Sequence, residues 1–402
     1  MAITIQQSPG AISPAANPLI FFVSSTNTGQ PNFRFIAEIK NSGGSVLAKK
    51  KFPIIPGTTK GWIDIHRTLE NYVTHDFDIS LITGAESSSS WFEYSVSFGE
   101  EYGSSPAEYL GLAGSGALRI WNGSLQTIEE FPDFDPADYL FDSAGSSGIW
   151  LSAFGSSKRI DLDQRDFLSF MCLNTAGPDQ IEIAALSSGG ATTTSRYNFP
   201  ALGSGRRVYR FPSGPENLNL IASLATGTPG AVIPANTISY TIRLRKSGAN
   251  FGPAFSYQIR SSCSIYPVVD CFFLNRFGAF ESFRFNRRSD IKREISRRQY
   301  DKPLIIPGAS SAGYLASAGS RTNYHTEISK SIRIFSDWIS ESESDGLIDL
   351  ASAPIAYLWS DGNLREVAID LKEISDYRKV NEKLRSFELS AEYSSKDRRQ
   401  SR

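Results

Sequence analysis

The sequence predicts a mainly β protein with two tandem β-sandwich domains followed by a small α+β domain. Phe, Tyr and Trp make up 12% of the residues, and 32 Gly and 20 Pro supply frequent turns, a composition typical of β-rich proteins. Short segments of alternating apolar and polar residues recur along the first two thirds of the chain. The length of 402 residues suits several domains, since one domain usually has ~100–200 residues.

The first predicted sandwich covers residues 1–130. Alternating or apolar runs bounded by turn formers predict strands at 19–23, 32–40, 46–52, 62–65 and 91–98. Residues 42–45 (SGGS) are expected to form a hairpin turn. One helical turn is expected within residues 64–73, because Ile65, Leu69 and Tyr72 follow a helical spacing.

A weak internal repeat predicts the second sandwich, at residues 131–285. The run at 19–29 has a counterpart at 167–177, and three shorter strings recur at nearly the same offset. This pattern fits a duplicated domain, and it also fits the strand rhythm that any two sandwiches share. The segment 128–138, with two prolines and several acids, is expected to be the linker.

Residues 286–402 are predicted to form the α+β domain. The charged segment 289–299 is expected to be helical, as is 337–350, and residues 303–322 read as a long Gly/Ser-rich arm. Strands are expected at 328–335, 355–359, 364–371 and 387–393. Asp361-Gly362 is a strong tight-turn signal. The tail at residues 394–402 contains no apolar side chain and is expected to fray.

The ends of the chain and its cysteines indicate a protein made in a reducing compartment. The N-terminus has no basic region followed by a long apolar run, so no signal peptide is expected, and no apolar run approaches the ~20 residues that span a bilayer. The cysteines are Cys172, Cys263 and Cys271, whose spacing fits no zinc pattern. Buried thiols are expected, although a turn at Tyr266-Pro267 could bring Cys263 to Cys271.

No motif for catalysis or for a cofactor is present. The three histidines lie in no H-E-x-x-H string, and there is no G-x-S-x-G elbow, phosphate-binding loop or dinucleotide fingerprint. We therefore expect no cofactor and no enzymatic activity. Two acidic triplets with one spacing fit either a calcium site or ordinary turn acids: Asp133, Asp135, Asp138 and Asp161, Asp163, Asp166.

Aromatic side chains offer a further possibility, which is stacking on sugars. The six tryptophans are Trp62, Trp91, Trp121, Trp150, Trp338 and Trp359. Most occupy strand-like contexts, where core packing is the expected role. A glycoside hydrolase would need a pair of carboxylates across the sugar bond, and nothing in the sequence selects such a pair.

One local charge anomaly stands out against a formal net charge of -1. Basic residues cluster within a short stretch: Arg284, Arg287, Arg288, Lys292, Arg293, Arg297 and Arg298. They fit a solvated helix face, a contact with acids of a neighbouring subunit, or a contact with nucleic acid. The net charge argues against a global polyanion-binding role.

Several strings together resemble virion structural proteins of tailed phages that infect Bacteroidetes. They lie at 17–23 (NPLIFFV), 53–65 (PIIPGTTKGWIDI), 97–103 (SFGEEYG) and 273–283 (FLNRFGAFESF). The resemblance implies an assembly component of a tail, baseplate or neck, located in the virion and made in the host cytoplasm. Its partners would be copies of itself and other virion proteins. No membrane partner is expected, nucleic acid is the less favoured partner of the basic stretch, and a host-surface glycan is the alternative partner. It identifies no catalytic residue.

The sequence thus predicts a non-enzymatic virion component that forms a ring or multimer. The expected contacts are the arm 303–322, including Tyr314, and the basic segment 284–298. The turn around Gly278 fits either a contact role or ordinary hairpin packing. The alternative functions are a host-glycan-binding adhesin and, more remotely, a glycan hydrolase.

Overall fold

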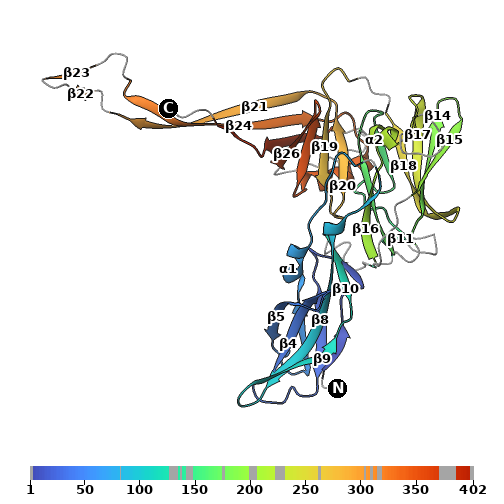
Figure 1. Cartoon of the computed structure of the whole chain (residues 1–402), viewed down its shortest axis with the longest axis vertical. Helices are drawn as coiled ribbons and strands as arrows, with labels where there is room; N and C mark the ends of the chain where they lie inside the picture. The colour runs from blue at the N-terminus through green and yellow to red at the C-terminus, as the bar shows by residue number, and fades with distance from the viewer. Residues whose placement is uncertain are drawn as a thin grey trace. The chain divides into compact units, whose positions relative to one another are not determined.

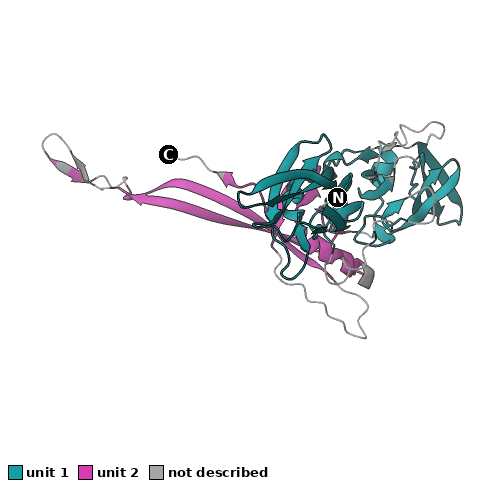
Figure 2. Ribbon diagram, turned by 90° about the horizontal axis from the view of Figure 1, so that it is seen from below, with its two compact units in different colours: residues 1–261, 274–281 teal, residues 262–273, 282–402 magenta. Residues whose placement is uncertain are grey.

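The computed structural model describes residues 3–81, 83–125, 135, 138–141, 148–173, 177–198, 206–221, 231–260, 264–302, 305–307, 311–314, 319–370 and 386–398. They divide into two compact units (Figure 2). Unit 1 comprises residues 1–261 and 274–281, and unit 2 comprises residues 262–273 and 282–402. The predicted mainly β class is confirmed, because strands dominate the described residues of both units and the helices are short.

The first sandwich of unit 1 consists of two sheets. One has the order β1 (Ile3–Gln7), β3 (Ile20–Ser25), β6 (Lys60–Asp64). The other has the order β2 (Ile12–Pro14), β10 (Leu118–Trp121), β8 (Trp91–Tyr102), β4 (Arg34–Asn41), β5 (Val46–Phe52), with β9 (Ala107–Gly114) also paired to β8. Phe21 and Phe98, with ring centroids 5.4 Å apart, join the sheets through a shared core.

Short helical segments in this sandwich match the sequence pattern. The expected helical turn forms α1 (His66–Leu69) and continues into the 3-10 turn η1 (Glu70–Tyr72), with Leu69 buried. A second 3-10 turn, η2 (Ser88–Ser90), leads into β8. The predicted turn at 42–45 closes the hairpin between β4 and β5, where the amide of Gly44 donates to the carbonyl of Asn41.

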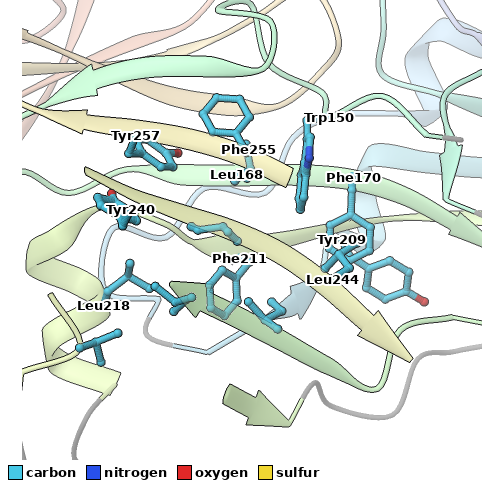
Figure 3. Packing of buried hydrophobic residues seen from close by; sticks show 14 of the residues in the cluster. Trp150, Leu168, Phe170, Tyr209, Phe211, Leu218, Tyr240, Leu244, Phe255 and Tyr257 are labelled. Carbon is cyan, nitrogen blue, oxygen red and sulfur yellow. The ribbon is translucent and has the colours of Figure 1, made fainter. Parts of the chain in front are cut away.

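The second sandwich of unit 1 encloses a core of aromatic side chains (Figure 3). One sheet has the order β11 (Leu140–Phe141), β13 (Phe167–Leu173), β16 (Arg206–Pro212), β7 (Ala85–Glu86). The other has the order β12 (Ser157–Ile160), β18 (Ala249–Ile259), β17 (Thr237–Lys246), β14 (Gln180–Ser187), β15 (Thr192–Asn198). Helix α2 (Pro215–Ile221) adds Leu218 to the core, and Trp150 packs edge-on against Phe170 and Phe255.

The two sandwiches share one strand order in their larger sheets. In each, the first pair is parallel (β2 with β10, β12 with β18) and the next three pairs are antiparallel. Strands that contain the repeated sequence strings occupy corresponding positions in the two sheets, β4 with β14 and β8 with β17. This common order fits both readings of the repeat, duplication and convergence.

Contacts between the two sandwiches explain why both fall within one unit. Strand β7 comes from the first third of the chain but pairs with β16 of the second sandwich. A third apolar cluster mixes residues of both, including Ile12, Trp121, Met171 and Val208, with Phe277. The described residues of both sandwiches therefore belong to one compact unit.

Unit 2 is built on one large sheet. Its order is β20 (Phe280–Phe285), β19 (Val269–Leu274), β25 (Ala356–Ser360), β26 (Asn363–Ile369), β27 (Glu388–Tyr393), β24 (Arg321–Phe335), β21 (Ser289–Asp301). Residues 269–273 and 282–285, expected in the second sandwich, belong to unit 2 because β19 and β20 join this sheet. Helix α3 (Glu341–Ala351) overlaps the predicted helix at 337–350 and ends one residue beyond it. Asp361 and Gly362 form the predicted turn, both with positive φ.

Three expectations for this region differ from the structure. Residues 289–299 are not helical but form β21, where the isoleucines at 291 and 295 fit a strand face as well as a helix face. The arm 303–322 contains a small hairpin, β22 (Ile305–Pro307) with β23 (Ala312–Tyr314). The tail does not wholly fray, because β28 (Asp397–Arg398) pairs with β24.

Candidate assembly site

The strands β21 and β24 form a long two-stranded ribbon at the edge of the sheet in unit 2 (Figure 1). Their antiparallel register runs from Ser289 opposite Ile334 to Asp301 opposite Arg321. Strand β27 pairs with β24 only along Ser331–Phe335, and β28 pairs with it at Glu327 and Ile328. Beyond these positions, the described residues contain no third strand along the ribbon.

A two-stranded ribbon without a covering layer is marginally stable in water. Every residue of β21 from Ile291 to Asp301 is exposed. A free edge strand of this length also presents a row of backbone hydrogen-bonding groups to other chains. The geometry therefore marks the ribbon as a surface that another chain can cover.

One face of the ribbon alternates apolar and basic side chains. Alternate residues of a strand share a face, so Ile291, Arg293, Ile295 and Arg297 project together from β21. Their directly opposite partners on β24 are Ile332, Lys330, Ile328 and Thr326. The side chains of Ile291 and Ile295 are 52% and 48% exposed. This face is apolar enough to bind a protein surface and positive enough to choose an acidic one.

Of the seven basic residues proposed from the sequence, four match the expected contact role best. Lys292, Arg293, Arg297 and Arg298 are exposed on β21, and the structure gives them no ion pair with any described residue. Arg287 pairs with Asp337 at 2.6 Å, and Arg288 pairs with Asp290 at 2.7 Å. These last two cations are exposed but already have an acidic neighbour.

Arg284 does not belong to this surface, which corrects the sequence-based proposal. Its guanidinium is buried and makes two bonds to Asp270, Nε to Oδ1 at 2.7 Å and Nη2 to Oδ2 at 2.9 Å. The reason is its position in β20, whose residues are buried by the sheet of unit 2. The charge run in the sequence spans this buried strand and the exposed strand β21.

The ribbon continues toward the predicted arm. The amide of Lys302 donates to the carbonyl of Ser320 at 2.7 Å, so the two segments that leave the ribbon are still hydrogen-bonded at this point. Tyr314 lies in β23, with its backbone opposite Ile305. Within the ribbon, a β-bulge follows Arg298, and the rings of Tyr300 and Tyr324 lie 6.2 Å apart.

The other candidate residues from the sequence have structural partners. Asp161 pairs with Arg260 and Asp166 with Lys158, both at 2.9 Å, and no group of metal-ligating residues occurs in the described parts of the chain. Asp133 lies outside the described residues. The calcium alternative therefore has no support in the second triplet.

The tryptophans and cysteines divide by burial. Trp121 and Trp150 are core residues, whereas Trp62 in unit 1 and Trp338 in unit 2 are each 54% exposed. Cys172 and Cys271 are buried as expected, and burial raises the pKa of the Cys271 thiol far above its usual range. Cys263 lies outside the described residues. Among the described helices, none has the length and apolar character to cross a membrane.

A buried network of hydrogen bonds around Asn275 and Glu281 in unit 1 is the feature that sequence reasoning missed. The side-chain oxygen of Asn275 accepts from the amides of Phe277 and Ala279, each at 3.0 Å, and so closes the turn around Gly278. Glu281 accepts from the Ser152 hydroxyl at 2.8 Å and from the Ala153 amide at 2.7 Å. The turn thus packs within unit 1, and the glutamate between Phe280 and Phe283 is the sequence signal that could have indicated it.

Comparisons with known proteins leave the family open. No family model matches the chain, and no curated protein matches it. One similar solved structure is the crystal structure of Salmonella alpha-2-macroglobulin reacted with methylamine, at 8% identity and a TM-score of 0.15. That alignment covers 99% of this chain and 27% of the other, so the chain spans about a quarter of that protein. A TM-score this low supports no argument about fold or function.

Proposed function

We propose that the protein is a non-enzymatic structural subunit that assembles by docking its β21–β24 ribbon onto a neighbouring subunit. The observation that carries this proposal is the exposed ribbon face on which Ile291 and Ile295 alternate with Arg293 and Arg297. A face of this kind gains free energy when its apolar side chains leave water. Its cations favour a neighbour with acidic side chains.

The neighbour is not expected to be the same strand of a second copy. Two β21 edges paired with each other would place cations opposite or diagonal to cations, which destabilises a sheet. A different, acidic surface on a copy of the chain or on another virion protein fits better. A head-to-tail contact of this kind repeats around an axis, and it closes into a ring when the rotation between neighbours divides a full turn. The resemblance to virion proteins of tailed phages favours a tail, baseplate or neck.

The test replaces residues 303–319 by a two-residue Asn-Gly turn, which suits a two-residue hairpin. The variant should remain folded by circular dichroism but should no longer form multimers in sedimentation velocity or electron micrographs. A second variant, Ile291→Ser with Ile295→Ser, should lose assembly in the same way. Ile238→Ser is its control, because Ile238 is 49% exposed on β17 of unit 1. Normal assembly of the Ile291→Ser, Ile295→Ser variant would refute docking through the ribbon, and normal assembly of the 303–319 variant would remove the arm from the contact.

A second candidate function is glycan binding, which one observation favours. Trp62 on β6 is exposed and lies directly opposite the half-buried Phe22 of β3, so the two rings share the outer face of the sheet. Aromatic rings of this kind stack on sugar rings. A glycan array with purified protein tests this function. Binding that disappears in Trp62→Ala but persists in Trp338→Ala would support it, whereas an array without hits would exclude it.

A further inference from the structure

The second sandwich buries a lysine and an aspartate against each other. Lys158 Nζ lies 2.9 Å from Asp166 Oδ2, and the two side chains are only 2% and 1% exposed. Lys158 belongs to β12 in one sheet, and Asp166 directly precedes β13 in the other. The pair therefore joins the two sheets of the sandwich.

The surroundings hold both groups in place. The Tyr257 hydroxyl donates to Asp166 Oδ2 at 3.1 Å and also lies 2.8 Å from Ser213 Oγ. The Phe154 ring centroid lies 4.7 Å from Lys158 Nζ. The backbone carbonyl of Asp166 accepts from the amides of Ser213 and Gly214 and from the Asn217 side chain. These contacts fix the carboxyl group relative to the amine.

A third ionisable group, Glu281, is connected to this pair through residues 152–154. Ser152 Oγ donates to the Glu281 carboxylate and accepts from the amide of Phe154, whose ring lies over Lys158 Nζ. Burial raises the pKa of Glu281 to about 7; the neighbouring Lys158 opposes this rise, and Asp166 adds to it. Near neutral pH, Glu281 therefore exists in both protonation states and can both accept and return a proton. Its carboxyl is oriented by the bonds from Ser152 and Ala153 described above.

We propose that Lys158 and Asp166 form an intramolecular isopeptide bond. A proton first passes from the ammonium to the carboxylate, which leaves a neutral amine and a neutral carboxylic acid. The amine nitrogen then attacks the Asp166 carboxyl carbon, so that an N–C bond forms. The C–OH bond breaks, and the hydroxyl leaves with the second amine proton as one water. No atom changes oxidation state and no co-reactant is needed; Glu281 relays the protons.

Three physical reasons favour this step. Lys158 Nζ already lies 2.9 Å from Asp166 Oδ2, so the amine and the carboxyl group are in contact, which removes much of the entropic cost of bringing them together. The near-complete burial of both side chains limits the access of water that would hydrolyse the amide. An amide also replaces two buried charges whose desolvation is expensive, so the product is better suited to this interior than the ion pair.

Intact mass spectrometry of the denatured full-length protein tests the proposal. The wild-type chain should weigh one water less than its sequence. Trypsin adds a second readout, since Arg159 and Arg165 separate the two residues along the chain. Without the bond, Lys158 and Asp166 leave in different peptides; with it, they leave in one branched peptide. A wild-type protein of full sequence mass after a day at neutral pH, with separate peptides, overturns the proposal.

Variants locate the bond and the relay. Lys158→Met and Asp166→Ala should each restore the full sequence mass, and Lys50→Met should keep the loss of water. Glu281→Gln should slow bond formation at least tenfold while the fold, followed by circular dichroism, stays intact. If a variant fails to fold, the mass and the peptide map of the wild type still decide. Unchanged kinetics in folded Glu281→Gln would remove Glu281 from the mechanism.

Discussion

Gly278 shows how one residue fixes the turn between β19 and β20. Its φ is +74°, and a Cβ at this position would lie 1.7 Å from the backbone oxygen of Asn122. Glycine is therefore required twice, by the backbone conformation and by the close approach of another segment of unit 1. The Asn275 side chain then holds the turn from inside.

We expect Gly278→Ala to lower the free energy of unfolding by about 3 kcal/mol or more, because the clash is with backbone and cannot be relieved by a rotamer change. Gly155→Ala is the matched control: its φ is +69°, but nothing lies within 4 Å of the added Cβ. That control should cost only about 1 kcal/mol. Urea unfolding measures both, and equal losses would contradict the argument.

At the scale of elements, local hydrogen bonds determine where α3 begins, whereas long-range pairing determines the conformation of β21. Helix α3 begins with a capping box, in which Ser340 Oγ accepts from the amide of Glu343 and the Glu343 carboxylate accepts from the amide of Ser340 at 2.9 Å. This local device explains why the helix begins at Glu341. Strand β21 has no such device and takes its form from pairing with β24.

Removing the cap by Ser340→Ala should destabilise unit 2 by about 1 kcal/mol, since the amide of Glu343 loses its acceptor. Ser344→Ala, inside the same helix, is the control and should be neutral or slightly stabilising because Ala has the higher helix propensity. Thermal unfolding followed by circular dichroism compares the two variants. A loss of stability in Ser344→Ala as large as that in Ser340→Ala would argue against the capping role.

At the scale of the whole molecule, charge is balanced overall but not locally. The formal net charge is -1, yet Lys292, Arg293, Arg297 and Arg298 follow one another on an exposed strand without an ion pair to any described residue. Exposed charges act at long range only when salt is low, since the screening length falls from ~10 Å at about 0.1 M to ~3 Å at about 1 M. Assembly through this strand should therefore depend on ionic strength.

We expect Arg293→Glu with Arg297→Glu to weaken assembly at least tenfold at low salt and to reduce its salt dependence. The control is Lys50→Glu with Arg67→Glu, which makes the same charge change in unit 1. Sedimentation velocity across a salt series measures both. Assembly that is insensitive to salt, or equally weakened in the control, would show that the charges of β21 do not select the neighbour.

The sequence determined the features that depend on local pattern. Alternation and turn formers predicted the β class, and the turn at Asp361-Gly362 was predictable because both residues tolerate positive φ. The internal repeat could be detected in the sequence because strands at equivalent positions need apolar residues at equivalent places. The sequence contains no recognisable catalytic motif, and the non-enzymatic role that we inferred from this stays a prediction.

Only the tertiary structure decided which residues are buried and which strands meet. The charged segment at 289–299 suits a helix as well as a strand, and long-range pairing with β24 selects the strand. Arg284 looks like its basic neighbours in the sequence, but pairing of its strand into the sheet buries it beside Asp270. Lys158 and Asp166 are close in the sequence, but they meet because β12 and β13 lie in different sheets of one sandwich. Glu281 comes from a segment more than a hundred residues away, which no local pattern can bring to them.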